Sequence, residues 1–248
     1  MGSKMKIEAV TVCMNYADFL AQSIPHNIRH FDKWIIVTTP NDTETQKLCS
    51  YYGLDYIKTE AARLNWGEFR KGECVTLGIN ELDKDDWLLL IDADTVLQPN
   101  FRRTFDILNI DNELDKSCLY TLDRVRFESF EEWQEFISRP TYNLGNRARD
   151  GRFCLPGFVP TGFFQMWHSS TGVLQYIHQW IECGGEDIRF SLLWPRNKRM
   201  FVPETTCYHL ASEPECNWLG RKSKPFEIDK KRGNYVSNFD DQAGLDRR

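Results

Sequence analysis

The sequence predicts an α/β domain in which a mostly parallel sheet is flanked by helices. Strand-like runs alternate with helical stretches over the first 110 residues, and those runs are short and almost entirely apolar. Continuous apolar strands separated by helices are typical of parallel sheets that are covered on both faces. The chain has 248 residues, which suits one large domain.

The elements follow in a regular order. In the first half, strands are expected at residues 7–13, 34–38, 56–59 and 87–91, and helices at 17–29, 43–52 and 69–82. Gly53 ends the second helix, because glycine readily adopts the left-handed conformation of a helix C-terminus. In the second half, strands are expected at 119–127 and 200–203, helices at 131–137 and 173–182, and a long loop at 139–160.

Composition excludes several classes of protein. The net charge of −5, from 31 basic and 36 acidic residues, argues against a general polyanion binder. We expect no membrane span and a cytoplasmic location, because no apolar run approaches about 20 residues and no secretory signal opens the chain. The eight cysteines form no C-x-x-C pair, and we expect them to be free thiols. Cys207, His209 and Cys216 lack a fourth ligand for zinc.

An apolar strand that ends in two carboxylates is the clearest local signal. Asp92 and Asp94 follow residues 87–91 and are one residue apart. Ligands of open parallel sheets bind beyond the carboxyl ends of the strands, and alternate residues of a strand face the same side. The pair therefore predicts a site for Mg²⁺ or Mn²⁺, with a solvated strand end as the alternative.

Two further segments carry candidate functional residues. Glu186 and Asp187 follow a glycine pair, where they either start a helix or present a general base to a cleft. His209 lies just past a strand-like run and is either a metal ligand or a half-buried ring. Arg221 either contacts a phosphate or lies on the surface.

The order of these motifs resembles that of nucleotide-sugar-dependent glycosyltransferases with the GT-A fold, inverting and similar to family 2. The resemblance extends from Ile7 to about Arg221. Residues 10–20 resemble the first strand and nucleotide-binding turn of that fold, and residues 37–45 its second strand with an acid that meets the base. Residues 69–72 resemble the basic segment before the helix that leads to the metal strand.

The resemblance implies a role for each motif. Asp92 and Asp94 would hold Mn²⁺ or Mg²⁺ against the donor diphosphate, with His209 as a third ligand. Asp187 would be the general base that accepts the proton of the acceptor hydroxyl, with Glu186 beside it. The nucleoside-diphosphate sugar, as donor substrate, would be bound by Val12, Asn15, Asp42, Lys71, Asp92, Ala93 and Arg221.

The resemblance also implies a domain organisation. One GT-A domain is expected at residues 5–236, with a nucleotide-sugar-binding half at 5–110, an acceptor-binding half at 111–236 as an extension, and a flexible tail at 237–248. Processive members carry an Arg-Trp pair where this chain has Leu193-Trp194. The missing arginine favours a soluble enzyme that adds a single sugar.

The acceptor is left open by the sequence. Residues 157–168 are rich in aromatic side chains, which either meet an acceptor or belong to the core. A saccharide or small-molecule hydroxyl is one alternative. The other is a hydroxymethylated base in phage-type DNA, in the host cytoplasm, because basic side chains alternate with aromatic ones at residues 218–235 and four arginines lie at 139–152.

Three rival classes share parts of this pattern. A sugar nucleotidyltransferase has a similar sheet, but it usually has a glycine-rich loop after the first strand, and residues 13–18 contain no glycine. A metal-dependent hydrolase would use the same acids on water. A non-catalytic binding module would not need the combination of two strand-end acids, a base and a histidine.

Overall fold

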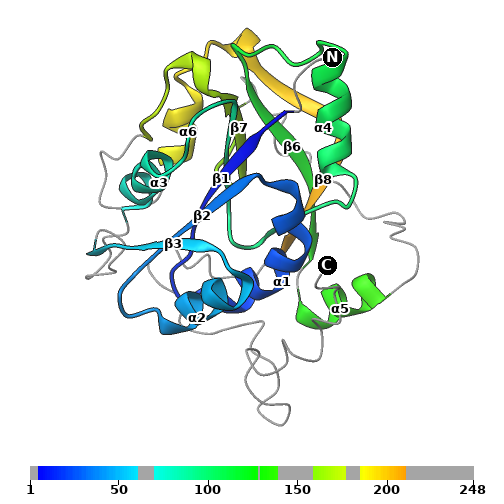
Figure 1. Ribbon diagram of the computed structural model, residues 1–248. Coiled ribbons are helices and arrows are strands. Elements are labelled where there is room, and N and C mark those ends of the chain that lie inside the picture. The colour runs from blue at the N-terminus through cyan, green and yellow to red at the C-terminus, as the bar shows by residue number, and fades with distance from the viewer. Residues whose placement is uncertain (1–4, 61–69, 128, 139–158, 177–184, 211–248) are drawn as a thin grey trace.

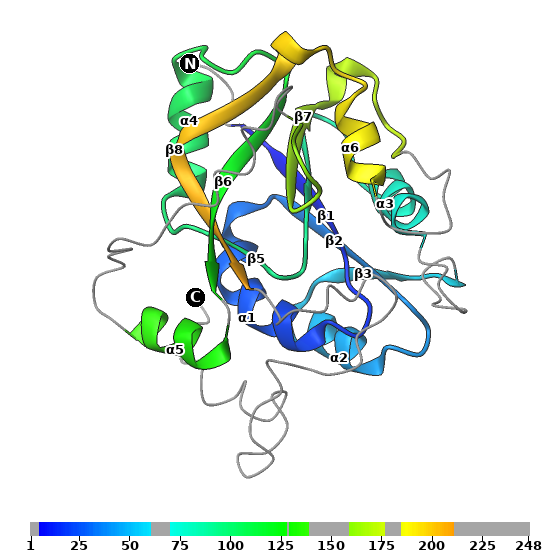
Figure 2. The same ribbon diagram turned by 180° about the vertical axis from the view of Figure 1, so that it is seen from behind.

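The computed structural model describes residues 5–60, 70–127, 129–138, 159–176 and 185–210. Their strands form one eight-stranded sheet in the order β3-β2-β1-β4-β7-β6-β8-β5, as Figures 1 and 2 show from opposite sides. The strands are β1 (Ile7–Val12), β2 (Lys33–Thr38), β3 (Asp55–Lys58), β4 (Trp87–Ile91), β5 (Thr95–Leu97), β6 (Leu119–Phe127), β7 (Phe164–His168) and β8 (Arg199–Leu210).

The first four strands of the sheet are parallel, as predicted. β3, β2, β1 and β4 run in one direction, and β8 is parallel to β6. β7 is antiparallel to both β4 and β6, and β5 is antiparallel to β8. The α/β prediction is confirmed, and the second half of the chain makes the sheet mixed.

Helices cover both faces of the sheet, which explains the uniformly apolar strands. On one face, α1 (Ala17–Asn27), α2 (Thr43–Tyr52) and α4 (Phe101–Ile110) enclose the largest apolar core. On the other, α3 (Lys71–Asn80) and α6 (Glu186–Ser191) enclose a second core. Every residue of β1 and β4 is buried. A third core lies under α5 (Phe130–Ser138), against the strands at the far end of the sheet.

Local signals set the bounds of the best-predicted helix. α2 begins after Asp42, whose carboxylate accepts the N–H of Thr45, and ends at Gly53 with φ of 66°. A side-chain acceptor satisfies an N–H group at the first turn, and a left-handed glycine closes the last one. The predicted bounds, 43–52, are those observed.

Two predictions for the second half were wrong in part. Residues 173–176 are not helical, while the rest of that predicted helix lies outside the described residues. The strand expected at 200–203 is the start of the twelve-residue β8. The register of β8 shifts between Val202 and Thr206, so Pro203 falls where the pairing with β6 is interrupted.

The described part of the aromatic run at 157–168, residues 159–168, contributes mainly to the core. β7 lies between β4 and β6 near the centre of the sheet, and all five of its residues are buried. β5, β7 and α4 were not predicted from the sequence. Residues 139–158 of the loop predicted at 139–160 and the basic residues after 210, including Arg221, lie outside the described residues. Of the helices in the described ranges, none has the length and apolar character needed to cross a bilayer.

Candidate active site

Hydrogen bonds of its backbone groups hold the loop that carries Asp92 and Asp94 in place. The loop joins β4 to β5, and its two acids lie beyond the carboxyl end of β4, as the sequence predicts. The N–H of Asp92 donates to the carbonyl of Phe163 at 3.2 Å, and the carbonyl of Asp94 accepts the N–H of Leu210 at 2.8 Å. The carbonyl of Ala93 accepts the Ser23 hydroxyl at 2.8 Å. Phe163, α1 and β8 thus hold the backbone of this turn in place.

Helix α1 supports the strand that follows the loop (Figure 2). The side-chain amide of the buried Asn27 donates to the carbonyl of Thr95 and accepts the N–H of Leu97, both at 2.8 Å. A buried backbone group without a partner is costly, so these two bonds fix the position of β5 against α1.

His209 lies next to Asp94 because of strand pairing. In the ladder between β5 and β8, His209 pairs with Thr95, the residue after Asp94. The Nε2 atom of His209 is 3.7 Å from Oδ2 of Asp94, and the two side chains are 18% and 20% exposed. The sequence prediction that these two residues share a site is thus consistent with their positions.

Asp92 forms an ion pair with Lys71 from the start of α3. The Nζ atom of Lys71 lies 2.6 Å from Oδ1 of Asp92, and both side chains are mostly buried, at 17% and 28% exposed. Removal from water raises the pKa of the Asp92 carboxyl above its usual value, and the Lys71 charge opposes this effect. The lysine expected beside the donor pyrophosphate is therefore already in contact with one of the two acids.

Glu186 and Asp187, the first two residues of α6, form hydrogen bonds with different segments of the chain. The helix begins after Gly185, whose φ of 88° favours glycine. Oδ2 of the half-buried Asp187 accepts the N–H of Gly162 at 2.8 Å. Oε2 of the buried Glu186 accepts the N–H of Gly72 at the start of α3, also at 2.8 Å. This bond joins α6 to α3, and both views show the two helices side by side (Figures 1 and 2).

Gly162 brings the two halves of the site together. A Cβ atom placed on Gly162 would lie 3.1 Å from Cβ of Asp187 and 3.2 Å from Nζ of Lys71. Such contacts are tight, so the absence of a side chain here lets Lys71 and Asp187 each lie close to the backbone of Gly162. Gly162 donates its N–H to Asp187, and the carbonyl of the next residue, Phe163, accepts the N–H of Asp92, so this short segment joins the β4 loop to α6.

Glu186 carries the clearest perturbed carboxyl of the site. Burial raises the pKa of Glu186 to about 7 from 4.5, against the opposing effects of the Gly72 N–H and the Lys71 charge. The folded chain keeps this proton where the unfolded chain has released it, so folding becomes less favourable as the pH rises through that window.

We therefore expect Glu186→Gln to alter the pH dependence of stability. The difference in Tm between the variant and the parent should shift in favour of the variant by several degrees from pH 5 to pH 8. Thermal unfolding across that range measures it. Glu73→Gln, which removes a carboxylate that is 38% exposed, is the control. A difference in Tm that stays constant with pH for Glu186→Gln would contradict this ionisation.

Asp42 and Asn15 meet at the turn after β1. Oδ2 of Asp42 accepts the N–H of Asn15 at 2.8 Å, and Asn15 has a φ of 55°. Asp42 also accepts from the hydroxyls of Thr38 and Thr45 and is 4% exposed. Its observed contacts shape the turn beyond the ends of β1 and β2. A contact of Asp42 with a nucleobase stays a prediction.

Several residues of the site were not found from the sequence. Gly72 and Gly162 act through their backbone N–H groups. Gln165 of β7 is fully buried, and its amide donates to the carbonyl of Asp187 at 3.0 Å and accepts the Tyr176 hydroxyl at 2.8 Å. Glutamine is uncommon at buried positions, so a glutamine inside the apolar run at residues 163–167 is the sequence signal that could have marked Gln165.

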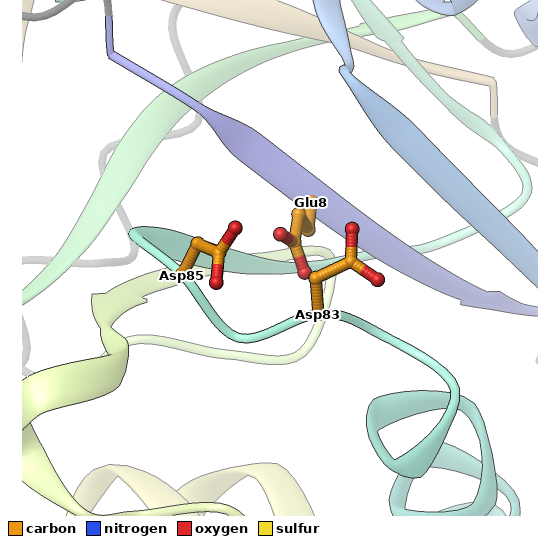
Figure 3. Close-up of side chains that lie close together, drawn as sticks. All are labelled: Glu8, Asp83 and Asp85. Atoms are coloured by element: carbon orange, nitrogen blue, oxygen red, sulfur yellow. The ribbon is translucent and has the colours of Figure 1, made fainter.

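A separate acidic group lies at the opposite end of the strands. Glu8, Asp83 and Asp85 bring one oxygen each within 4.8 Å of one another, and Figure 3 shows their side chains next to one another. Asp83 pairs with Lys33 and Asp85 with Lys6, at 2.7 and 2.9 Å. Glu8 accepts the N–H of Lys84. These contacts with lysine residues account for the group.

Comparison with known proteins gives the fold. No family model and no curated protein matches the chain. Among solved structures, glucosyl-3-phosphoglycerate synthase from Mycobacterium tuberculosis, in complex with Mn²⁺, UDP-glucose and glycerol 3-phosphate, aligns with a TM-score of 0.51. The identity is 13%, over 85% of this chain and 73% of that one.

Two other solved structures align less well. Mannosyl-3-phosphoglycerate synthase from Rubrobacter xylanophilus has a TM-score of 0.38 and 20% identity, over 49% of this chain. This chain spans only 41% of the length of that protein. A 4-diphosphocytidyl-2C-methyl-D-erythritol synthase from Anaerococcus prevotii has a TM-score of 0.44 and 13% identity, over 81% of this chain and 87% of that one. The likeness to the mycobacterial synthase confirms the predicted GT-A fold.

Proposed function

We propose that the protein is a metal-dependent glycosyltransferase that moves a sugar from a nucleotide-sugar donor to an acceptor hydroxyl, with inversion. One observation carries the proposal. The carboxylates of the β4 loop, the histidine of β8 and an acid of α6 lie around the edge where the parallel strands end, and Lys71 links that loop to α6. Donors bind at that edge in open α/β sheets.

The residues at this edge fit a divalent cation. Asp94 and His209 offer an oxygen and a nitrogen atom, which suit Mn²⁺ and Mg²⁺. Asp92 is paired with Lys71, and neither of its oxygens lies within 4.8 Å of both Asp94 Oδ2 and His209 Nε2. The 3.7 Å between His209 Nε2 and Asp94 Oδ2 is less than two metal–ligand bonds of about 2.1 Å, so both atoms can contact one ion. The bound ion would neutralise the charge that develops on the departing nucleoside diphosphate.

Asp187 is the residue suited to activate the acceptor. Its carboxylate is half-buried, and the Gly162 N–H fixes one oxygen. It accepts the proton of the acceptor hydroxyl as that oxygen attacks the anomeric carbon, and a single displacement inverts the centre. Glu186 is buried against the backbone of α3, so its role is to position Lys71 and α6 rather than to contact substrate.

The donor would lie across the ends of β1, β2 and β4. Lys71 supplies a positive charge for the pyrophosphate, while Val12, Asn15, Asp42 and Ala93 line the side of the nucleoside. Arg221 would add a second charge from outside the described residues. The mycobacterial synthase was crystallised with UDP-glucose, which is therefore the first donor to test.

The acceptor remains one of two classes. The first class is a saccharide or another small molecule, whose hydroxyl would meet Asp187 at the edge where the parallel strands end. The second class is a hydroxymethylated base in DNA. The backbone phosphates of that DNA would be bound by the basic residues at 221–232.

Product analysis tests the proposed reaction. The protein is incubated with nucleotide sugars, starting with UDP-glucose, and with Mn²⁺ or a chelator, in the presence of hydroxymethylated DNA or a panel of saccharides. Transfer of the labelled sugar to an acceptor, with release of a nucleoside diphosphate, is the expected result. Release of free sugar alone would indicate a hydrolase. In a separate incubation with a nucleoside triphosphate and a sugar phosphate, release of pyrophosphate would indicate a nucleotidyltransferase.

A further inference from the structure

Lys71 is mostly buried, at 17% exposed, and its ammonium group contacts the carboxylate of Asp92. Its Nζ atom is 2.6 Å from Asp92 and close to Gly162, against which Asp187 packs. Its charge also acts on Glu186, which is bonded to the next residue along the chain, Gly72. One ammonium group thus balances acids from the β4 loop and from α6.

This position conflicts with a cation on Asp92. An ion bound to Oδ1 of Asp92 at about 2.1 Å would lie within roughly 4.7 Å of the Lys71 ammonium, since the ion pair measures 2.6 Å. Like charges at that separation repel each other strongly where water is largely excluded. A divalent ion alone must therefore either displace Lys71 or bind beside it at reduced affinity.

A nucleoside diphosphate changes this balance. Its phosphates offer the Lys71 ammonium several negative oxygens, and lysine is a flexible point charge that binds phosphate well. Only a short movement of the four-carbon side chain is needed for Lys71 to exchange Asp92 for a phosphate oxygen. Asp92 is then available to the ion.

We propose that Lys71 couples metal binding to nucleotide binding: it occupies Asp92 when the site is empty and moves to the donor phosphate when nucleotide and ion bind together. The inference rests on the proposed donor and metal site. It makes Lys71 a positioning residue that disfavours the bare ion and favours the ion together with its nucleotide. Because coupling between two ligands is reciprocal, the ion must tighten nucleotide binding by the same factor.

Equilibrium dialysis of Mn²⁺ tests the coupling without an activity assay. Mn²⁺ affinity is measured for the parent chain and for Lys71→Met, without nucleotide and with saturating UDP, GDP, ADP or CDP. We expect the effective nucleotide to tighten Mn²⁺ binding by about tenfold or more in the parent. Without nucleotide, Lys71→Met should bind Mn²⁺ about tenfold more tightly than the parent, and the effect of nucleotide should fall to about twofold or less.

Three variants make the result specific. Lys71→Arg keeps the charge and should keep the weak affinity for Mn²⁺ alone. Lys198→Met removes an ion pair of the same 2.6 Å length, with Asp115, from the other end of β8, and should behave like the parent. If the Tm of Lys71→Met is several degrees below that of the parent, Lys71→Gln is used in the dialysis instead. The glutamine amide removes the charge but can still donate a hydrogen bond to Asp92.

The outcomes separate this inference from the proposed function. Equal affinities for Mn²⁺ alone in the parent and in the Lys71 variants, with Mn²⁺ binding lost in Asp94→Ala, would overturn the role of Lys71 and leave the metal site standing. No Mn²⁺ binding in any variant with any nucleotide would overturn both.

Discussion

Replacing Asp94 by alanine is expected to abolish sugar transfer and to remove the Mn²⁺ dependence of nucleotide binding. Asp94 and His209 approach each other at the end of the loop that Phe163, Ser23 and Leu210 hold in place. Loss of the ion would cost several kcal/mol of stabilisation of the leaving group, which corresponds to a rate at least about 10³-fold lower. Transfer rates and nucleotide affinity with and without Mn²⁺ measure the effect.

A second acidic group supplies the control for this experiment. Asp83 belongs to the group shown in Figure 3, which is the one set of three or more candidate ligands that the described residues bring within 4.8 Å. Asp83→Ala should leave transfer and its Mn²⁺ dependence unchanged. If Asp83→Ala removed the Mn²⁺ dependence while Asp94→Ala kept it, the ion would be bound at the wrong end of the sheet for this account.

Replacing Asp187 by asparagine should reduce kcat by about 10²–10⁴-fold while donor affinity stays the same, the range expected when a general base is removed. The amide oxygen of asparagine can still accept the N–H of Gly162, so the start of α6 should keep its place. The loss is then of proton acceptance rather than of structure. Single-turnover rates and nucleotide binding, measured on the same protein, separate the two.

The contrast with Glu186 sharpens that test. Glu186→Gln keeps the hydrogen bond to Gly72 and leaves Asp187 in place, so its kcat should fall far less than that of Asp187→Asn. A loss of donor binding in Asp187→Asn would make Asp187 a structural acid. A larger loss of kcat in Glu186→Gln would exchange the roles proposed for the two residues.

Much of the fold follows from local sequence signals. The strands β1 and β4 are buried on both faces, so their unbroken apolar runs identify them. The bounds of α2 follow from Asp42 and Gly53, which close its two ends. By contrast, β5 has only three residues, and β7 takes its place through pairing with β4 and β6, which no local pattern specifies.

The site was predictable where it depends on strand ends and less so where it depends on tertiary contacts. Asp92 and Asp94 are visible because they end an apolar strand. Their connection to α6 runs through Lys71 and the backbone of Gly162, and a backbone N–H has no signature in the sequence. Burial of Glu186, and the rise in its pKa, arise only when α6 packs against α3.

Thermal unfolding with nucleoside diphosphates tests whether the ends of β1, β2 and β4 bind a metal-dependent nucleotide donor. The chain is heated with each of UDP, GDP, ADP and CDP, in Mn²⁺ or in a chelator. A ligand at 100 times its Kd adds about 2.7 kcal/mol, which raises the Tm of a domain of this size by several degrees. We expect such a rise with one nucleotide, in Mn²⁺ only, and its loss in Asp94→Ala. An unchanged Tm with every nucleotide in Mn²⁺ would contradict the donor site.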